Sequence, residues 1–344
     1  MNLLILGGGI FLGAHTLNAA VERGHAVTVF NRGRTRSAWP AGVEVLTGDR
    51  GADLSLLAGR RWHAVIDTCG YTPADVQAST EALREACACY LFVSSVSAYA
   101  DMAEPMTAED QPLASFDGIA RDDADRRHYG PQKAACEAEV MRVFGARALI
   151  VRPGLVVGPG DPTGRFSHWV WRAAEGGAML VPDAPDDQPL QFIDVRDLTA
   201  WMIHLLEAGA RGPFNASGPV GGAAIGWRAL IDACRAEAIA TGHAPAEVAR
   251  VGEAFLLEQG VQPWSELPLW LPSIDPAFDG FQRDLGRATA AGLTTRALRE
   301  TVQAVLAEGL PPDDDRRRAG KLTRAREAEL LAVWSTHPER SPRP

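Results

Sequence analysis

Residues 2–32 constrain the fold of this chain more strongly than any other stretch. Residues 3–6 form a short, unbroken apolar run, which is typical of a strand buried on both faces. A glycine-rich turn follows, and the pattern then predicts a helix over residues 11–23 and a second strand over residues 26–30. A strand, a glycine turn, a helix and a strand in this order form half of a dinucleotide-binding fold.

The glycine-rich turn predicts a site for the pyrophosphate of a dinucleotide. Glycines let the backbone approach the phosphates closely, and the helix N-terminus offers unpaired N–H groups and a partial positive charge. The motif is imperfect, because Leu12 and Ile10 occupy positions where the two common glycine patterns have glycine. A turn that only joins a strand to a helix is therefore the alternative. The expected contacts with the cofactor in this turn are Gly7, Gly9, Ile10, Phe11, Leu12 and Gly13.

Composition excludes several classes of protein. The chain has 344 residues, enough for one large α/β domain and a smaller one, and its net charge of -9 argues against nucleic acid as a partner. Five cysteines, an odd number without a disulfide framework, suit a reducing cytoplasm. The first apolar run is short and has no basic region before it, so we expect a strand there and not a signal peptide. No stretch approaches the length of a membrane span, and we predict a cytoplasmic protein without a membrane partner.

The end of the second predicted strand indicates which dinucleotide is bound. Asn31 lies where an aspartate or glutamate would bind the ribose hydroxyls of NAD. Arg32, Arg34 and Arg36 follow, and guanidinium groups can pair with a 2′-phosphate. We therefore predict NADP(H) as the cofactor, with NAD as the alternative. The other interpretation is that these arginines are solvated charges of a loop.

Two further predicted strands, residues 43–46 and 64–67, end in residues that should line the cofactor. In a parallel sheet the carboxyl ends of the strands face the ligand crevice. Asp49 could accept a hydrogen bond from the adenine amino group, and Cys69 is expected to be a small wall residue and not a nucleophile. The predicted contacts after these strands are Asp49 and Arg50, then Thr68, Cys69, Gly70 and Tyr71.

The candidate catalytic residues follow a fifth predicted strand, residues 90–93. Serines stand at its end, and further along Tyr129 and Lys133 lie four residues apart, on one face of a predicted helix. A lysine ammonium beside a phenol lowers the pKa of the phenol from ~10 towards the working range. Tyr129 is thus a candidate general acid/base, while a serine hydroxyl could hold the substrate oxygen. The alternative is a surface tyrosine–lysine pair.

In these motifs the chain resembles the extended short-chain dehydrogenases/reductases, the group of NAD(P)-dependent epimerases and dehydratases. The resemblance spans about residues 1–310 and is carried by residues 6–13, 92–95, 129–133, 152–154 and 192–198. It implies an α/β fold, a doubly wound parallel Rossmann sheet with a smaller C-terminal substrate lobe. It also implies that Tyr129 handles the hydroxyl proton, that Ser95 is the catalytic serine, and that Lys133 binds the nicotinamide ribose. Pro153, at the end of a sixth predicted strand, is a further expected cofactor contact.

Departures from the family pattern narrow the expected chemistry. Val96 and Ser97 stand where sugar dehydratases of this group have an acid and a base. Leu155 and Leu190 replace an asparagine and an arginine that are usual in nucleotide-sugar enzymes. Losing both weakens the case for a nucleotide sugar, since a buried diphosphate needs charged partners, although Arg165 or Arg172 could replace them. The candidate substrate contacts are Ser97, Arg165 and His168.

Glycine and proline between residues 153 and 162 mark the exit from the sheet. We expect an NAD(P)-binding domain over residues 1–155, to which about residues 190–216 return. Within this returning segment, Asp197 is expected to cap a helix that ends at Leu206, since an acid at a helix start stabilises the helix. A substrate-binding lobe should span residues 156–310, with a further helix over residues 246–259. Residues 311–344 are predicted to form a charged break and a C-terminal helix, with a loose tail after His337.

Together the residues and the resemblance predict an NADP(H)-preferring oxidoreductase that acts on a secondary alcohol or ketone of a small molecule. The first alternative is a sugar or nucleotide-sugar epimerase that retains NAD. The second, of another class, is a non-catalytic protein that senses a dinucleotide or binds RNA, as a related plant branch does in plastids. No metal site is predicted, and a homodimer is compatible with the sequence.

Overall fold

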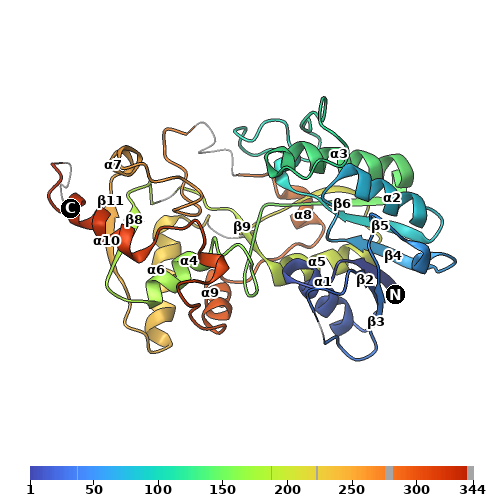
Figure 1. The fold of residues 1–344 in the computed structure, drawn as a ribbon, viewed down its shortest axis with the longest axis horizontal. Coiled ribbons are helices and arrows are strands. Elements are labelled where there is room, and N and C mark those ends of the chain that lie inside the picture. The colour runs from blue at the N-terminus through green and yellow to red at the C-terminus, as the bar shows by residue number, and fades with distance from the viewer. Residues whose placement is uncertain (37, 187, 222–223, 276–281, 339–344) are drawn as a thin grey trace. The chain divides into compact units, whose positions relative to one another are not determined.

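The computed structural model describes residues 1–36, 38–186, 188–221, 224–275 and 282–338. The chain divides into two compact units (Figure 1). The first comprises Met1–Val156, Phe192–Gly221 and Arg283–Thr295, and the second comprises Val157–Gln191, Gly222–Gln282 and Arg296–Pro344. Residues 283–295 therefore belong to the first unit and not to the substrate-binding lobe, in which the sequence analysis placed them. The described part of residues 311–344, predicted to form a charged break and a C-terminal helix, groups with the second unit.

A seven-stranded parallel sheet forms the centre of the first unit, in the order β10-β6-β5-β4-β1-β2-β3. The predicted doubly wound α/β fold is confirmed, because helices cover both faces of this sheet (Figure 1). The strands are β1 (Asn2–Leu6), β2 (Ala26–Asn31), β3 (Glu44–Thr47), β4 (Trp62–Asp67), β5 (Cys87–Val93), β6 (Ala148–Pro153) and β10 (Gly212–Ala216).

Side chains of β1 alternate between two apolar cores, as the period of a strand requires. Leu3 and Ile5 pack in the core under α1 (Phe11–Glu22), α5 (Val195–Glu207) and α8 (Gly286–Ala290). Leu4 and Leu6 pack on the opposite face, in the core under α2 (Pro73–Leu83) and α3 (Tyr129–Phe144). All four side chains are at most 1% exposed, which explains why this strand reads as an unbroken apolar run.

Helix α5 begins earlier than the sequence suggested. Asp194 is its N-cap, and the carboxylate accepts a hydrogen bond from the backbone N–H of Arg196 at 2.8 Å. The prediction that Asp197 caps this helix is wrong, because the cap needs an extended backbone, which Asp194 has. Asp197 lies in the first helical turn, where its charge still suits the helix dipole.

The second unit combines short helices with one pair of parallel strands, β8 and β11. The predicted helix over residues 246–259 is wrong in its first half, because that segment pairs with β8 and Gly252 separates it from the helix that follows. The tail predicted after His337 lies, apart from Pro338, outside the described residues. The elements of this unit are α4 (Ser167–Ala174), β8 (Ala178–Pro182), α6 (Trp227–Ala240), β11 (Glu247–Val251), α7 (Glu253–Glu258), α9 (Leu298–Leu306) and α10 (Arg324–Trp334).

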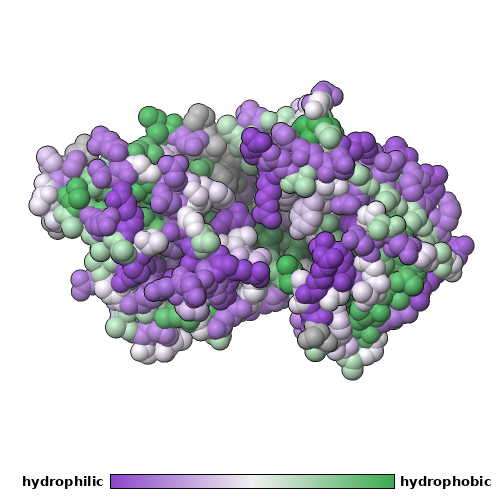
Figure 2. Space-filling model, viewed as in Figure 1, coloured by the Kyte–Doolittle hydropathy of each residue, from purple (hydrophilic) through white to green (hydrophobic). Residues whose placement is uncertain are grey.

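Two short strands, β7 (Leu155–Val157) and β9 (Phe192–Asp194), pair with each other, and five 3-10 helices complete the described elements. The 3-10 helices are Ser55–Leu57, Val96–Ala98, Arg126–His128, Gly145–Arg147 and Arg316–Arg318. None of the helices in the described ranges is long and apolar enough to cross a membrane. On the face drawn in Figure 2, hydrophilic residues predominate and hydrophobic ones occur in small groups.

The close packing of α1 against the glycine turn predicts the effect of a Gly13→Ala substitution. A Cβ atom at Gly13 would lie 2.6 Å from the backbone nitrogen of Gly8, which cannot move aside as a flexible side chain would. We expect a loss of about 1–3 kcal/mol in the free energy of unfolding, together with weaker dinucleotide binding. Urea denaturation and cofactor titration measure the two effects. Asn18→Ala, in the same helix, is the control and should change neither; a Gly13→Ala variant as stable as this control would contradict the packing argument.

Candidate functional site

In the turn between β1 and α1, the three glycines Gly7, Gly8 and Gly9 present only backbone to a ligand. Gly7 and Gly8 adopt φ angles of 110° and 79°, which side-chain-bearing residues rarely adopt. Ile10 is the N-cap of α1 and supplies no side-chain hydrogen bond to the first turn. The N-terminal N–H groups of the helix are therefore available to an anion. This turn fits the pyrophosphate of a dinucleotide.

The side chain of Asn31, at the end of β2, ties that strand to the glycine turn. Its Nδ2 donates a hydrogen bond to the carbonyl oxygen of Gly7 at 3.1 Å, and its Oδ1 accepts one from the N–H of Gly33 at 2.7 Å. Arg32 and Arg34 are exposed and form no ion pair within the described part of the chain. Arg36 differs, because its guanidinium donates to the carbonyl of Ala38 and lies over an indole ring.

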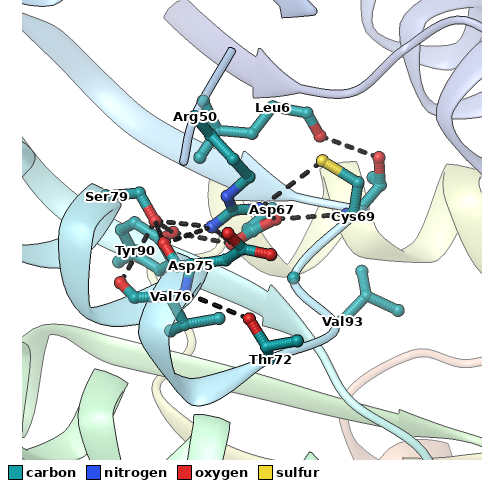
Figure 3. A network of polar contacts seen from close by, with 12 residues as sticks. Leu6, Arg50, Asp67, Cys69, Thr72, Asp75, Val76, Ser79, Tyr90 and Val93 are labelled. Atoms are coloured by element: carbon teal, nitrogen blue, oxygen red, sulfur yellow. Dashed lines mark hydrogen bonds and ion pairs between the residues drawn. The ribbon is translucent and has the colours of Figure 1, made fainter. Parts of the chain in front are cut away.

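A buried network of polar side chains fixes the end of β4 (Figure 3). The carboxylate of Asp67 accepts two hydrogen bonds from Arg50, both at 2.8 Å, and is fully buried. The hydroxyl of Tyr90 donates to the same carboxylate at 2.8 Å, and the backbone N–H of Cys69 donates to it at 3.1 Å. Arg50 also donates to the hydroxyl of Ser79. The buried Arg50–Asp67 ion pair therefore fixes the turn after β4.

Both members of this ion pair are charged. Burial raises the pKa of Asp67, but the charge and hydrogen bonds of Arg50 outweigh burial and hold the pKa below its usual value. Burial likewise opposes the charge on Arg50, yet Asp67 holds the pKa of the guanidinium well above its usual value. The prediction that Arg50 contacts the cofactor does not fit this geometry, because its guanidinium is bound inside the unit. Asp49 remains exposed, with its carboxylate accepting from the N–H of Gly51.

The residues that follow Asp67 form the edge of the expected cofactor site. The hydroxyl of Thr68 donates to the carbonyl of Leu6 at 2.9 Å, which joins the ends of β4 and β1. Burial raises the pKa of the Cys69 thiol, although the nearby Arg50 opposes this effect. A thiol with a raised pKa stays protonated and is a poor nucleophile, which suits the interpretation of Cys69 as a wall residue.

The ammonium of Lys133 lies almost completely buried, at 3% exposure, where the ends of β4 and β5 meet helix α3. Its Nζ donates hydrogen bonds to the carbonyl oxygens of Gly70 and Val93, each at 2.8 Å. Aromatic rings surround it as well, with the centroid of Tyr71 at 5.2 Å and that of Tyr129 at 5.9 Å. Burial lowers the pKa of Lys133 from its ordinary value, against the opposing effect of neighbouring groups such as Cys136, Tyr71 and Asp67.

The turn after β5 packs directly against the start of α3. The side chain of Ser95 is mostly buried, and its Oγ accepts a hydrogen bond from the backbone N–H of Ser97 at 3.1 Å. A Cβ atom at Gly130 would collide with the carbonyl oxygen of Ser97, so only glycine allows this approach. Tyr129, the first residue of α3, directly precedes that contact. The structure thus places the segments that carry Ser95, Tyr129 and Lys133 side by side.

Three further residues at this edge of the sheet were not among the predicted catalytic or substrate residues. Tyr71 follows Gly70, and its ring lies over the ammonium of Lys133. Its place shortly after the end of β4 is the sequence feature that could have identified it as a site residue. The hydroxyls of Ser94 and Ser217 are buried after β5 and β10 without a hydrogen-bond partner in the described part of the chain. Buried hydroxyls without partners are uncommon and mark places where a ligand or water can bind. Pro153 ends β6 beside them, as expected.

The predicted substrate residues Arg165 and His168 belong to the second unit. Arg165 donates from Nε to the hydroxyl of Thr163 at 3.2 Å, and its guanidinium lies 5.9 Å from the ring centre of Trp264. Burial, and then the nearby charges of Lys321 and Arg318, lower the pKa of His168 to about 3, so its ring is neutral. A role for Arg165 and His168 in substrate binding stays a prediction.

Part of the sequence is similar to a known family of proteins. Residues 72–217 match the model of the NAD dependent epimerase/dehydratase family. The 2-alkyl-3-oxoalkanoate reductase of Stenotrophomonas maltophilia is 27% identical over 231 residues, which are 62% of this chain and 67% of that protein.

Solved structures show the same fold. The enzyme WbmH of Bordetella bronchiseptica, in complex with NAD+, aligns with a TM-score of 0.62 at 18% identity, over 89% of this chain and 97% of that one. A UDP-glucose 4-epimerase aligns with a TM-score of 0.63 at 17% identity, over 90% of this chain and 98% of that one.

The buried ion pair predicts a large effect of Asp67→Asn. The substitution leaves the guanidinium of Arg50 buried without a counter-charge, and we expect a loss of about 3–5 kcal/mol in the free energy of unfolding at pH 7. Tyr90→Phe is the matched control, because it removes one hydrogen bond to Asp67 and keeps the pair. It should lose about 1.5 kcal/mol.

The same pair predicts a dependence on pH. The pKa of Asp67 is lower in the folded chain than the ~3.9 of an unfolded aspartate. Its stabilisation is therefore complete above that value and is lost as the pH falls through the folded pKa. Urea denaturation of wild type and Asp67→Asn should show a gap that narrows in acid; equal stability of the two at pH 7 would contradict the role of the pair.

Proposed function

Since the chain belongs to the NAD-dependent epimerase/dehydratase family of enzymes, we propose that it is an NAD(P)-dependent oxidoreductase that interconverts a secondary alcohol and a ketone of a small molecule. The observation that supports this best is the setting of Lys133. Its buried ammonium is fixed by two carbonyl oxygens, one helical turn after Tyr129 and beside the turn that carries Ser95. A surface tyrosine–lysine pair would not bury its lysine.

Each of the three residues has a distinct part in the proposed reaction. The positive charge of Lys133 favours the ionised form of a neighbouring phenol, so Tyr129 can give a proton to the substrate oxygen or take it back. The hydroxyl of Ser95 holds that oxygen in place. When bound, the nicotinamide supplies or accepts the hydride at the substrate carbon. The carbonyls of Gly70 and Val93 keep the ammonium from turning away during this exchange.

We propose NADP(H) as the preferred cofactor, with NAD as the alternative. The glycine turn would hold the pyrophosphate, while the exposed guanidinium groups of Arg32 and Arg34 would pair with the 2′-phosphate. Asn31 is occupied by hydrogen bonds within the turn and carries no charge that would repel that phosphate. The other proposed contacts with the cofactor are Gly7, Gly9, Ile10, Phe11, Leu12, Gly13, Asp49, Thr68, Cys69, Gly70, Lys133 and Pro153.

An epimerase with a retained cofactor is the second candidate, favoured by the family match over residues 72–217. The side chains at Leu155 and Leu190 count against it for nucleotide sugars, because they offer no charge to a diphosphate. The identity of the dinucleotide that copurifies separates the two candidates. Retained NAD+ would support epimerisation, and exchangeable NADPH would support a reductase.

The proposed proton transfer predicts the effect of Tyr129→Phe. The substitution keeps the ring and its packing, so the variant should bind cofactor nearly normally and melt within a few degrees of wild type. Its turnover should fall by ~10²–10⁴, the usual contribution of a positioned general acid/base. Steady-state kinetics and thermal melting measure both properties. Lys133→Met should differ by also losing cofactor affinity. Retention of most of the turnover by Tyr129→Phe would show that another group moves the proton.

The proposed cofactor preference predicts the effect of Arg32→Ala. Loss of one charged contact with the 2′-phosphate should weaken NADPH binding by ~1.5–3 kcal/mol and leave NADH binding nearly unchanged. Titration of both cofactors by calorimetry or fluorescence measures the difference. Arg36→Ala is the matched control in the same loop, since its guanidinium already has partners. Equal losses of NADPH and NADH affinity in Arg32→Ala would argue against NADP(H).

A further inference from the structure

Tyr71 differs from the buried tyrosines of the first unit. Tyr90 and Tyr99 are at most 2% exposed, and their hydroxyls donate to Asp67 and Asn215. Tyr71 is 56% exposed, and within the described ranges its hydroxyl has no hydrogen-bond partner. Tyr90 and Tyr99 are structural, whereas the phenol of Tyr71 is available to a ligand.

The position of the Tyr71 ring is nevertheless defined. The ring centre lies 5.2 Å from Nζ of Lys133, within the range of a cation–π interaction. The preceding residue, Gly70, binds the same ammonium through its carbonyl oxygen at 2.8 Å. The backbone and the ring of this dipeptide are therefore both held by Lys133. An exposed tyrosine without such an anchor would change rotamer freely.

The Tyr71 ring also lies near the proposed reaction centre. Two phenol rings lie near the ammonium of Lys133, with the centroid of Tyr71 at 5.2 Å and that of Tyr129 at 5.9 Å. Tyr71 stands after the carboxyl end of β4, on the edge of the sheet where ligands of this fold class bind. A ring that contacts the ammonium and keeps an unused donor at this place combines the apolar contact and the polar contact that small-molecule sites employ.

We propose that Tyr71 is a substrate-binding residue whose hydroxyl donates a hydrogen bond to a second oxygen of the substrate, near the reacting carbon. This inference rests on the proposed function, which assigns the reacting oxygen to Tyr129 and Ser95. The substrate class that follows is a ketone or secondary alcohol that carries another acceptor close by, such as a carboxylate, carbonyl or hydroxyl oxygen. A plain ketone would leave this donor without a partner.

Kinetics of Tyr71→Phe with two probe ketones test the inference. 3-Oxooctanoate carries a carboxylate near its ketone, and 2-heptanone is the same ketone without the carboxylate. Tyr71→Phe should raise KM for 3-oxooctanoate about ten-fold, leave kcat within a factor of two, and leave KM for 2-heptanone unchanged. Equal changes for both ketones, or no change for either, would overturn the inference.

A second measurement does not depend on turnover. The chain has four tyrosines, so labelling with ¹³Cζ-tyrosine gives four resonances, and Tyr71→Phe assigns that of Tyr71. In wild type this resonance should move when 3-oxooctanoate is added to the complex with NADP+, and should not move with 2-heptanone. A shift caused by NADP+ alone would place Tyr71 on the cofactor and overturn the inference, as would the absence of any shift.

The two measurements separate failure of this inference from failure of the proposed function. Absence of turnover in wild type, together with a shift of Tyr71 on addition of 3-oxooctanoate, would reject the oxidoreductase and keep the substrate contact. Normal turnover with an unaffected Tyr71→Phe variant would keep the oxidoreductase and reject the contact. Thermal melting of Tyr71→Phe serves as the folding control, and the exposure of this side chain predicts an unchanged melting temperature.

Discussion

The hydrogen bonds from Lys133 to the carbonyl oxygens of Gly70 and Val93 are the interaction on which the arrangement of the site depends. An ammonium at 3% exposure is costly to bury, and burial accordingly lowers its pKa. Two carbonyl oxygens and the faces of aromatic rings compensate for the lost water. Because the carbonyl of Val93 ends β5 and that of Gly70 lies in the turn after the neighbouring strand β4, these bonds also fix helix α3 against the sheet. The position of the proposed catalytic lysine and the packing of helix α3 therefore have the same cause.

The Arg50–Asp67 pair supports this arrangement from within the sheet (Figure 3). A buried ion pair is weak evidence of net stability, because desolvation offsets much of the attraction. Its value here is geometric, since the Asp67 carboxylate holds the N–H of Cys69 and so shapes the turn that presents the carbonyl of Gly70. The Asp67 carboxylate accepts from Arg50, from Tyr90 and from the N–H of Cys69, and a buried carboxylate with this many donors has few alternative positions.

Features of the structure that depend on neighbouring residues could be predicted from the sequence. The sheet could be predicted from the apolar run of β1 and the glycine turn. The one-turn spacing of Tyr129 and Lys133 indicated that these two residues share one face of a helix. Contacts between distant segments could not be predicted in this way. Arg50 looked like a cofactor ligand because its partner Asp67 lies on another strand, and the pairing of β11 with β8 overrode a helical pattern. The N-cap of α5 is Asp194 and not Asp197, because Asp194 has the extended backbone that a cap needs, and this conformation could not be read from residue types.

The end of β2 shows how a cofactor preference can arise without exclusion of the other cofactor. In an NAD-selective site a carboxylate binds the ribose hydroxyls and also repels a 2′-phosphate. Asn31 can do neither, since its amide is bound to Gly7 and Gly33 and has no charge. The proposed preference for NADP(H) would then come from attraction by the exposed arginines alone. Attraction between exposed charges is partly screened by salt, so the proposed preference would be graded and not absolute.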